Sequence, residues 1–368
     1  MLTIMRFDST HNSKRSAFTL VEILVTVMIL SILSSMILFA MTSALEMAKE
    51  QQTKSRIARL DREISRLWNG YLSRRVPIRF YNPDPIDDPE DDANNISPSD
   101  WYGLKQWRDA RKQGRLVALR DLMRLEMPDR ITDVIVPPAV DFNGDGNIDD
   151  ADRPAASKAY WDIAQAAGWD GQDPGEMSNQ GAECLYMIVQ FHVGNGPRGR
   201  SFFSEEMVAD VDGDGMPEYV DAWGEPIHFC RWAPGFVSSF HSAPKDPSDL
   251  SYLDPFDPHG VDNMWASANT ATNPQRFPLH PLIISAGPNR QLAIVTGVDG
   301  DDPISFRQDM PNTHGLLKNQ LNVKYYIDPY QQIATGKQIG SVIDPNPAIS
   351  DPAYSASDNI HNHFVETN

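Results

Sequence analysis

A run of oxygen-bearing side chains between residues 141 and 152 carries the clearest chemistry in this sequence. It reads Asp-Phe-Asn-Gly-Asp-Gly-Asn-Ile-Asp-Asp-Ala-Asp, with carboxylate or amide side chains at alternating positions and glycine at the sixth. Calcium takes about six to eight oxygen ligands, and glycine at that position permits the sharp turn that brings alternating side chains inward. We therefore expect this first loop (residues 141–152) to bind calcium. Its candidate ligands are Asp141, Asn143, Asp145, Asn147, Asp149 and Asp152.

The same spacing recurs in a second loop, residues 210–221, which reads Asp-Val-Asp-Gly-Asp-Gly-Met-Pro-Glu-Tyr-Val-Asp. Two matches in one chain favour calcium binding over coincidence. The alternative is that both segments are acidic Asp-Gly turns that bind no ion. The candidate ligands of the second loop are the side chains of Asp210, Asp212, Asp214, Glu218 and Asp221 and the backbone carbonyl of Met216.

The first loop differs from an EF-hand in two ways. Its twelfth residue is Asp152, where an EF-hand has a bidentate glutamate. Pro137 and Pro138 precede the loop and Pro154 follows it, so the helices that flank an EF-hand are not expected. The loop resembles the dockerin or thrombospondin-type calcium repeat more closely, which leaves its affinity and coordination number open.

Nearer the N-terminus, one carboxylate stands at the head of an apolar segment of membrane length. Leu20 to Ala40 is about 21 residues, or about 31 Å as a helix, which is enough to cross the hydrocarbon core. Its one charged residue is Glu22. A carboxylate at the bilayer centre costs about 2.5–3.5 kcal/mol, so an acid in such a segment points to a function. Lys14 and Arg15 place the N-terminus in the cytoplasm and the chain after Met41 outside it.

The residues around Glu22 resemble the class III signal of type IV prepilins and type II secretion pseudopilins. That signal has a short basic leader, glycine or alanine before the cut, phenylalanine after it and glutamate at the fifth mature position. Ala17, Phe18 and Glu22 match these places. The resemblance implies cleavage between Ala17 and Phe18 by prepilin peptidase, and N-methylation of Phe18. It also implies that Glu22 neutralises the α-amino group of a neighbouring subunit during assembly.

The alternatives for this segment are a plain single-pass anchor and an ordinary secretory signal. A secretory signal would be cut after its apolar core, and no clear cleavage site follows Ala40. The basic pair, the small residue, the phenylalanine and the glutamate coincide in register with the apolar run, which favours the prepilin interpretation.

Two further stretches resemble the major pseudopilin of type II secretion. Residues 221–227 (Asp-Ala-Trp-Gly-Glu-Pro-Ile) resemble its Asp-Pro-Trp-Gly-Asn-Pro turn into a strand, with Ala222 and Glu225 departing from the pattern. Residues 285–289 and a later acidic cluster resemble that family's calcium loop, although Asn-Arg at 289–290 replaces the usual Asp-Gly. The resemblance implies a third calcium site. Its candidate ligands are Asp299, Asp301 and Asp302.

The apolar segment is expected to continue as a helix to Tyr71, because Gly70 is the first proline or glycine after Leu45. Such a helix, from about Phe18, would be roughly 80 Å long. Its second half carries one apolar stripe with spacings of three and four, which predicts packing on the chain's own domain. Basic residues between 49 and 79 predict a solvated face, or a contact for anionic lipid headgroups or a neighbouring subunit. The stripe comprises Ile57, Leu60, Ile64, Leu67 and Tyr71.

The remaining patterns predict an α+β fold, in which the long N-terminal transmembrane-plus-amphipathic helix packs on a small antiparallel β-sheet domain with calcium loops. Helices are expected over 101–126, 157–167 and 184–193, and strands within 219–232 and 282–295. We expect a leader (1–17), a pilin helix (18–72, membrane part 20–40), a periplasmic α+β domain (73–335, insertion about 82–170) and a disordered tail (336–368).

The net charge, the motif content and the cysteine count exclude some classes of function. A net charge of −18 argues against nucleic acid as the primary partner. The sequence has no nucleophile elbow, P-loop or metalloprotease helix, so we expect no enzyme activity. Its two cysteines, Cys184 and Cys230, are too few for a disulfide framework, and they could pair in the periplasm or stay as free thiols.

These features predict a pilin-like structural subunit that serves protein secretion in a pseudopilus or pilus. It would be a single-pass inner-membrane protein with a cytoplasmic N-terminus and a periplasmic domain, and it would enter an extracytoplasmic fibre. The expected partners are prepilin peptidase, the inner-membrane assembly machinery and other pilin-like subunits in a homo- or hetero-oligomer, with calcium as cofactor. The alternative is a membrane-tethered periplasmic binding protein or hydrolase that uses a prepilin-type signal without polymerising.

Overall fold

The chain divides into two compact units, Met1–Lys49 and Glu50–Asn368. The computed structural model describes residues 19–76, 112, 114–145, 147–169, 179–193, 203–238, 240, 254–259, 278–296, 329, 338–342 and 358–363. Within these ranges the fold is α+β, with one long N-terminal helix and two small antiparallel sheets.

The long helix α1 (Leu20–Leu72) begins with a capping box. The Thr19 hydroxyl accepts a hydrogen bond from the Glu22 backbone N–H at 3.3 Å, and the Glu22 carboxylate accepts from the Thr19 N–H at 2.8 Å. This reciprocal pair satisfies donors that the first turn of a helix leaves free. The helix predicted from about Phe18 to Tyr71 is therefore confirmed from Leu20 onwards.

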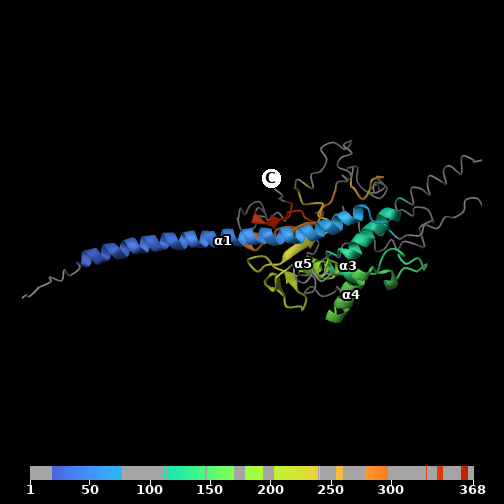
Figure 1. Ribbon diagram of the computed structural model, residues 1–368, viewed down its shortest axis with the longest axis horizontal. Helices are drawn as coiled ribbons and strands as arrows, with labels where there is room; N and C mark the ends of the chain where they lie inside the picture. The colour runs from blue at the N-terminus through green and yellow to red at the C-terminus, as the bar shows by residue number, and fades with distance from the viewer. Residues whose placement is uncertain are drawn as a thin grey trace, which may run out of the picture. The chain divides into compact units, whose positions relative to one another are not determined.

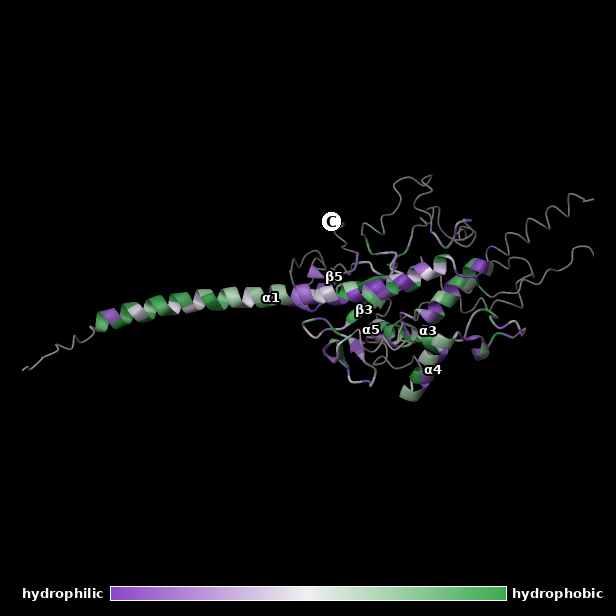
Figure 2. Ribbon diagram, viewed as in Figure 1, coloured by the Kyte–Doolittle hydropathy of each residue, from purple (hydrophilic) through white to green (hydrophobic). Residues whose placement is uncertain are grey.

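In the first unit, the part of α1 up to Lys49 is apolar and uncovered. All its large hydrophobic side chains from Leu20 to Met47 are exposed, and Figure 2 shows this part of the helix mostly in green. A helix that is apolar on all sides suits a membrane span. By length and composition, α1 can cross a membrane.

In the second unit, the rest of α1 buries one face in the domain core. The predicted stripe is correct except at one position, because Trp68 is buried and Leu67 only partly so. The Trp68 indole N–H donates to the Leu279 carbonyl at 3.1 Å, and its ring meets Phe256 edge-on. The buried residues of α1 are Thr53, Arg56, Ile57, Leu60, Ile64, Trp68 and Tyr71.

Arg56 corrects the expectation that the basic residues between 49 and 79 form a solvated face. Its side chain is buried, and one guanidinium nitrogen donates to the carbonyl oxygens of Val220 and Asp221, each at 2.7 Å. A charged donor can stay buried because it is paired with acceptors. Arg56 thus links α1 to the end of the second loop.

The other helices lie close to their predicted places. Of the helix predicted over 101–126, residues 114–126 are helical, and residues 101–111 and 113 lie outside the described residues. The next helices are α3 (Ile131–Ile135) and α4 (Ala155–Ala167). Gly168 ends α4 in the left-handed conformation with φ 82°, which is common for glycine just after a helix. The segment 184–193, whose pattern only leaned towards helix, is helical as α5 (Gln180–Met187) and a π-helix (Ile188–Val193).

Two antiparallel sheets complete the described fold (Figure 1). In the smaller one, β1 (Val208–Ala209) pairs with β2 (Glu218–Tyr219) across the second loop. In the larger, β4 (Leu282–Ser285) lies between β3 (Ile227–Cys230) and β5 (Ile360–His361).

Strand β5 corrects the expectation of a disordered tail over 336–368. Ile360 is buried and pairs with Ser285, and the Asn362 side chain donates to Asp61 on α1 at 2.7 Å. Residues 338–342 are also described, with Ile339 buried and Val342 bridged to Ile294. Although this segment is mostly polar, these short stretches are ordered because they pair with other parts of the domain.

The main core joins elements that are far apart in the sequence. Ile64 of α1, Met123 of the 114–126 helix, Leu185 of α5, Phe229 of β3 and Ile283 of β4 belong to one buried cluster. The described part of the segment 82–170, which we expected to be an insertion, therefore contributes to the same core. Close approach of α5 to β3 depends on a glycine, because a Cβ on Gly181 would lie 2.7 Å from a β3 carbonyl oxygen.

A paired set of buried charges fixes the end of β3. The Arg231 guanidinium donates to Asp133 at 2.8 Å and to the Met127 carbonyl at 2.7 Å, and its backbone N–H donates to Asp129. Nearby, Cys184 and Cys230 are buried free thiols and do not form a disulfide with each other. Burial raises the pKa of the Cys230 thiol to about 12, which makes it a poor nucleophile at neutral pH.

Candidate functional site

The predicted processing residues Ala17 and Phe18 lie outside the described residues. Of the predicted N-terminal site residues, the structure therefore describes Glu22. The Glu22 carboxylate is exposed and accepts hydrogen bonds from the Thr19 N–H at 2.8 Å and the Thr19 hydroxyl at 2.9 Å. In a single chain, Glu22 therefore caps its own helix. This role differs from the intersubunit role that the prepilin resemblance implies, and the capping box is a Thr-x-x-Glu pattern that the sequence displays at residues 19–22.

A second candidate site is a carboxylate cluster between α5 and the β1–β2 loop. Side-chain oxygens of Asp210, Asp212 and Asp214 lie within 4.8 Å of one another, and so do those of Glu183, Asp212 and Glu218. Asp212 belongs to both groups and joins them. The structure therefore brings together most predicted ligands of the second loop and adds Glu183, which the loop pattern does not contain.

Hydrogen bonds from the loop backbone and from Asn179 hold four of these carboxylates in place. The Asp210 carboxylate accepts from the Gly213 N–H at 2.7 Å, and that of Asp214 accepts from the Met216 N–H at 2.7 Å. The two glycines of the loop have φ values of 81° and 95°, which glycine adopts readily and other residues rarely do. The Asn179 amide bridges Asp212 at 3.0 Å and Glu218 at 3.4 Å.

Glu183 is the exception in this cluster. It is fully buried on α5, and neither of its carboxylate oxygens has a hydrogen-bond partner. One oxygen of Asp214, Oδ2, is likewise buried without a partner. Buried polar groups in folded proteins are almost always paired, so unpartnered carboxylate oxygens facing other acids need an explanation.

The pKa values of these carboxyl groups also reflect the crowding of negative charge in the cluster. Burial first, and then the neighbouring Asp214, Asp212 and Glu218, raise the pKa of Glu183 to about 9. Burial also raises the pKa of Glu218 to about 7, with Asp212 and Asp210 adding to the shift. Raised carboxyl pKa values mean that the ion-free cluster cannot hold all its negative charges at neutral pH.

Asp221, the last candidate ligand of the second loop, lies outside the cluster. Its Oδ1 accepts from the backbone N–H groups of Trp223 and Glu225, at 2.8 and 3.0 Å, and its Oδ2 accepts from the Ser285 hydroxyl at 2.6 Å. It therefore stabilises the Trp-Gly turn before β3 and ties that turn to the end of β4. The spacing of the loop predicted a metal ligand at this position, and the side chain serves the turn instead.

The first loop is organised around Asp152. Asp152 is buried, and its Oδ1 accepts from the N–H groups of Phe142 and Asn143 at 2.8 and 2.9 Å, while its Oδ2 accepts from Asp149 N–H at 3.1 Å. Among the described residues, this loop does not bring three carboxylates within 4.8 Å of one another. Calcium binding by the first loop therefore stays a prediction.

The third predicted calcium site is only partly described. Asp299, Asp301 and Asp302 lie outside the described residues. The turn that precedes them is present, and the Asn289 amide donates to Asp358 of the C-terminal segment at 2.8 Å. Calcium binding at this third site therefore stays a prediction.

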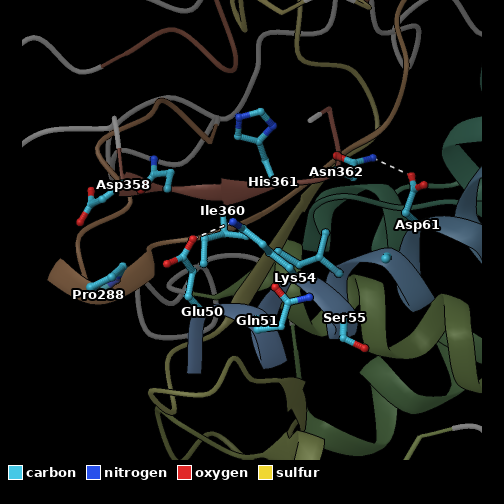
Figure 3. Close-up of a pocket in the computed structure, with 13 residues that line it drawn as sticks. Glu50, Gln51, Lys54, Ser55, Asp61, Pro288, Asp358, Ile360, His361 and Asn362 are labelled. Carbon is cyan, nitrogen blue, oxygen red and sulfur yellow. Dashed lines mark hydrogen bonds and ion pairs between the residues drawn. The ribbon is translucent and has the colours of Figure 1, made fainter. Parts of the chain in front are cut away.

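A pocket of about 660 Å³ lies between α1 and the C-terminal strand (Figure 3). On the α1 side, Lys54 pairs with Glu50 at 2.6 Å, and on the other side His361 and Asn362 belong to the tail. Burial lowers the pKa of His361 to about 4, so this imidazole is neutral at physiological pH.

Comparison with known proteins finds one match. Residues 12–38 match a family model described as the prokaryotic N-terminal methylation motif. No curated protein and no solved structure matches the chain. The matched residues include Ala17, Phe18 and Glu22 and most of the exposed apolar part of α1. The chain therefore carries a prepilin-type N-terminal signal, followed by a helix that suits membrane anchoring.

Proposed function

We propose that this protein is a pilin-like structural subunit that assembles through its N-terminal helix into a pseudopilus or pilus serving protein secretion. Prepilin peptidase would cut between Ala17 and Phe18 at the cytoplasmic face of the inner membrane, and Phe18 would then be N-methylated. The second unit, Glu50–Asn368, would lie in the periplasm. Calcium at the acidic loops would stabilise that unit rather than take part in catalysis.

The observation that carries the proposal is the coincidence of three features on one segment. The N-terminal methylation motif spans 12–38, the helix from Leu20 is apolar on every side, and its only charge before Glu46 is Glu22. A membrane covers such a surface before assembly, and neighbouring helices of the same kind can cover it in a fibre. A simple anchor needs no carboxylate at that depth.

Glu22 variants separate assembly from helix capping. Glu22→Gln keeps the shape of the side chain and can still accept from the Thr19 N–H, because glutamine also serves in a capping box. It lacks the negative charge that would pair with the α-amino group of a neighbouring subunit. Glu22→Ala lacks both. Each full-length variant is expressed in a host with its assembly machinery, and the membrane and sheared-fibre fractions are compared by immunoblot.

We expect all three proteins in the membrane and only the wild type in the fibre fraction, with both variants reduced at least tenfold there. Normal assembly of Glu22→Gln with loss of Glu22→Ala would show that capping, not charge, is the role of Glu22. Normal behaviour of both variants would instead favour the alternative, a membrane-tethered binding protein or hydrolase that does not polymerise.

A further inference from the structure

The carboxylate cluster has the dimensions of a cation site. Calcium–oxygen distances are about 2.3–2.6 Å, so two ligand oxygens on opposite sides of one ion lie about 4.6–5.2 Å apart, and other ligand pairs lie closer together. The oxygens of Glu183, Asp212 and Glu218 satisfy this limit, and so do those of Asp210, Asp212 and Asp214. Asp212 belongs to both groups, so the two groups adjoin each other.

Within the described ranges, the negative charge of this cluster is not paired with a basic side chain. Among the described residues, no lysine or arginine forms an ion pair with any of these carboxylates. Glu183 is the decisive member, because it reaches the cluster from a different element and is completely buried with both oxygens unpartnered. A surface group of acids can be solvated, but a buried carboxyl group beside other acids stays ionised only with a counter-ion.

The donor set selects the ion. The cluster offers only oxygen atoms, whereas zinc prefers sulfur and nitrogen ligands. Magnesium demands near-octahedral geometry and keeps several waters, while calcium accepts many carboxylates in irregular arrangements. Asp210 and Asp212 are exposed, so an ion can approach from solvent.

We propose that Glu183 of α5 completes a calcium site with Asp210, Asp212, Asp214 and Glu218. In a calcium loop of this spacing, the twelfth residue closes the coordination sphere. Here that residue, Asp221, is engaged in the turn before β3, and Glu183 takes its place from a helix that contacts β2. The bound ion fastens the β1–β2 loop to α5. This inference does not depend on how the N-terminal helix is processed.

The test uses the full-length protein in detergent, stripped with chelator and titrated with calcium chloride in a calorimeter. The variants are Glu183→Gln, Asp212→Asn and, as a control, Glu205→Gln, which alters an exposed carboxylate outside the cluster. We expect the wild type and Glu205→Gln to bind alike. Glu183→Gln and Asp212→Asn should each lose one calcium per chain or bind it at least tenfold more weakly. Calcium binding by the first loop should be the same in all four proteins. Differences between them therefore report on the carboxylate cluster.

Thermal unfolding supplies a second readout, in which the melting temperatures of the wild type and Glu183→Gln are compared with and without calcium. In excess chelator, Glu183→Gln should melt no lower than the wild type, because a neutral amide of the same shape replaces the buried carboxyl group. In saturating calcium the wild type should gain several degrees and melt above the variant. Calcium binding by Glu183→Gln with wild-type affinity and stoichiometry would overturn the proposal. If that variant does not fold, the exposed Asp212→Asn decides, and unchanged calcium binding by it overturns the proposal as well.

Discussion

Replacing Arg56 with methionine tests how the second half of α1 is held on its domain. Arg56 is 8 % exposed, and one of its guanidinium nitrogens donates to the carbonyls of Val220 and Asp221 at 2.7 Å each. Hydrogen bonds to charged groups contribute about 1.5–3 kcal/mol each. The two bonds share one nitrogen, and burying the guanidinium opposes them. We therefore expect a net loss of about 2–3 kcal/mol in the free energy of unfolding.

The assay is thermal unfolding of the full-length protein in detergent, followed by circular dichroism. For a unit of this size, 1 kcal/mol corresponds to about 2 °C, so Arg56→Met should lower the melting temperature by roughly 4–6 °C. Arg56→Lys should fall in between, because it keeps the charge without the planar fork. The control is Arg59→Met, an exposed position on the same helix, where we expect a change within about 0.5 kcal/mol. Equal melting of Arg56→Met and Arg59→Met would refute this role for Arg56.

Two further predictions concern the packing and the acid stability of the second unit. Gly181→Ala should destabilise the fold, because its Cβ would lie 2.7 Å from a backbone oxygen of β3, whereas Gly70→Ala, with nothing within 4 Å on α1, should stabilise it by about 0.5–1 kcal/mol. Denaturant unfolding checks both, and a neutral Gly181→Ala would contradict the close packing of α5 on β3. Burial lowers the folded-state pKa of His228 to about 4, below its unfolded value of about 6.5. Protonation therefore favours the unfolded chain, and stability is lost as the pH falls from about 6.5 through about 4. Melting curves of His228→Gln should decline less over that range, and parallel curves for the two proteins would contradict the assignment.

The sequence predicts well what depends on neighbouring residues. The long helix, the glycine stop of α4 and the strands around residues 227 and 283 follow from local periodicity and turn chemistry. Trp68 shows the limit of such patterns, because adjacent helical positions differ by about 100°, and the position that faces the core depends on the surface it meets. The stripe indicated the correct face but placed Leu67 there instead.

What the sequence could not predict depends on contacts between distant segments. Glu183 stands far from the second loop in the chain, so no loop spacing includes it. Its one signal is a carboxylate inside a short apolar helix, the same kind of anomaly that marks Glu22. The C-terminal strand could not be predicted for a related reason, because Ile360 forms a strand by pairing with β4.

The central claim is that the chain is processed as a prepilin and enters a fibre. The mature N-terminus of the protein purified from its host membrane tests this most directly. Digestion with a protease that cuts after glutamate should release the peptide Phe18–Glu22, heavier by one methyl group on the α-amino nitrogen. An intact Met1, or a first residue beyond Ala40, would contradict the account.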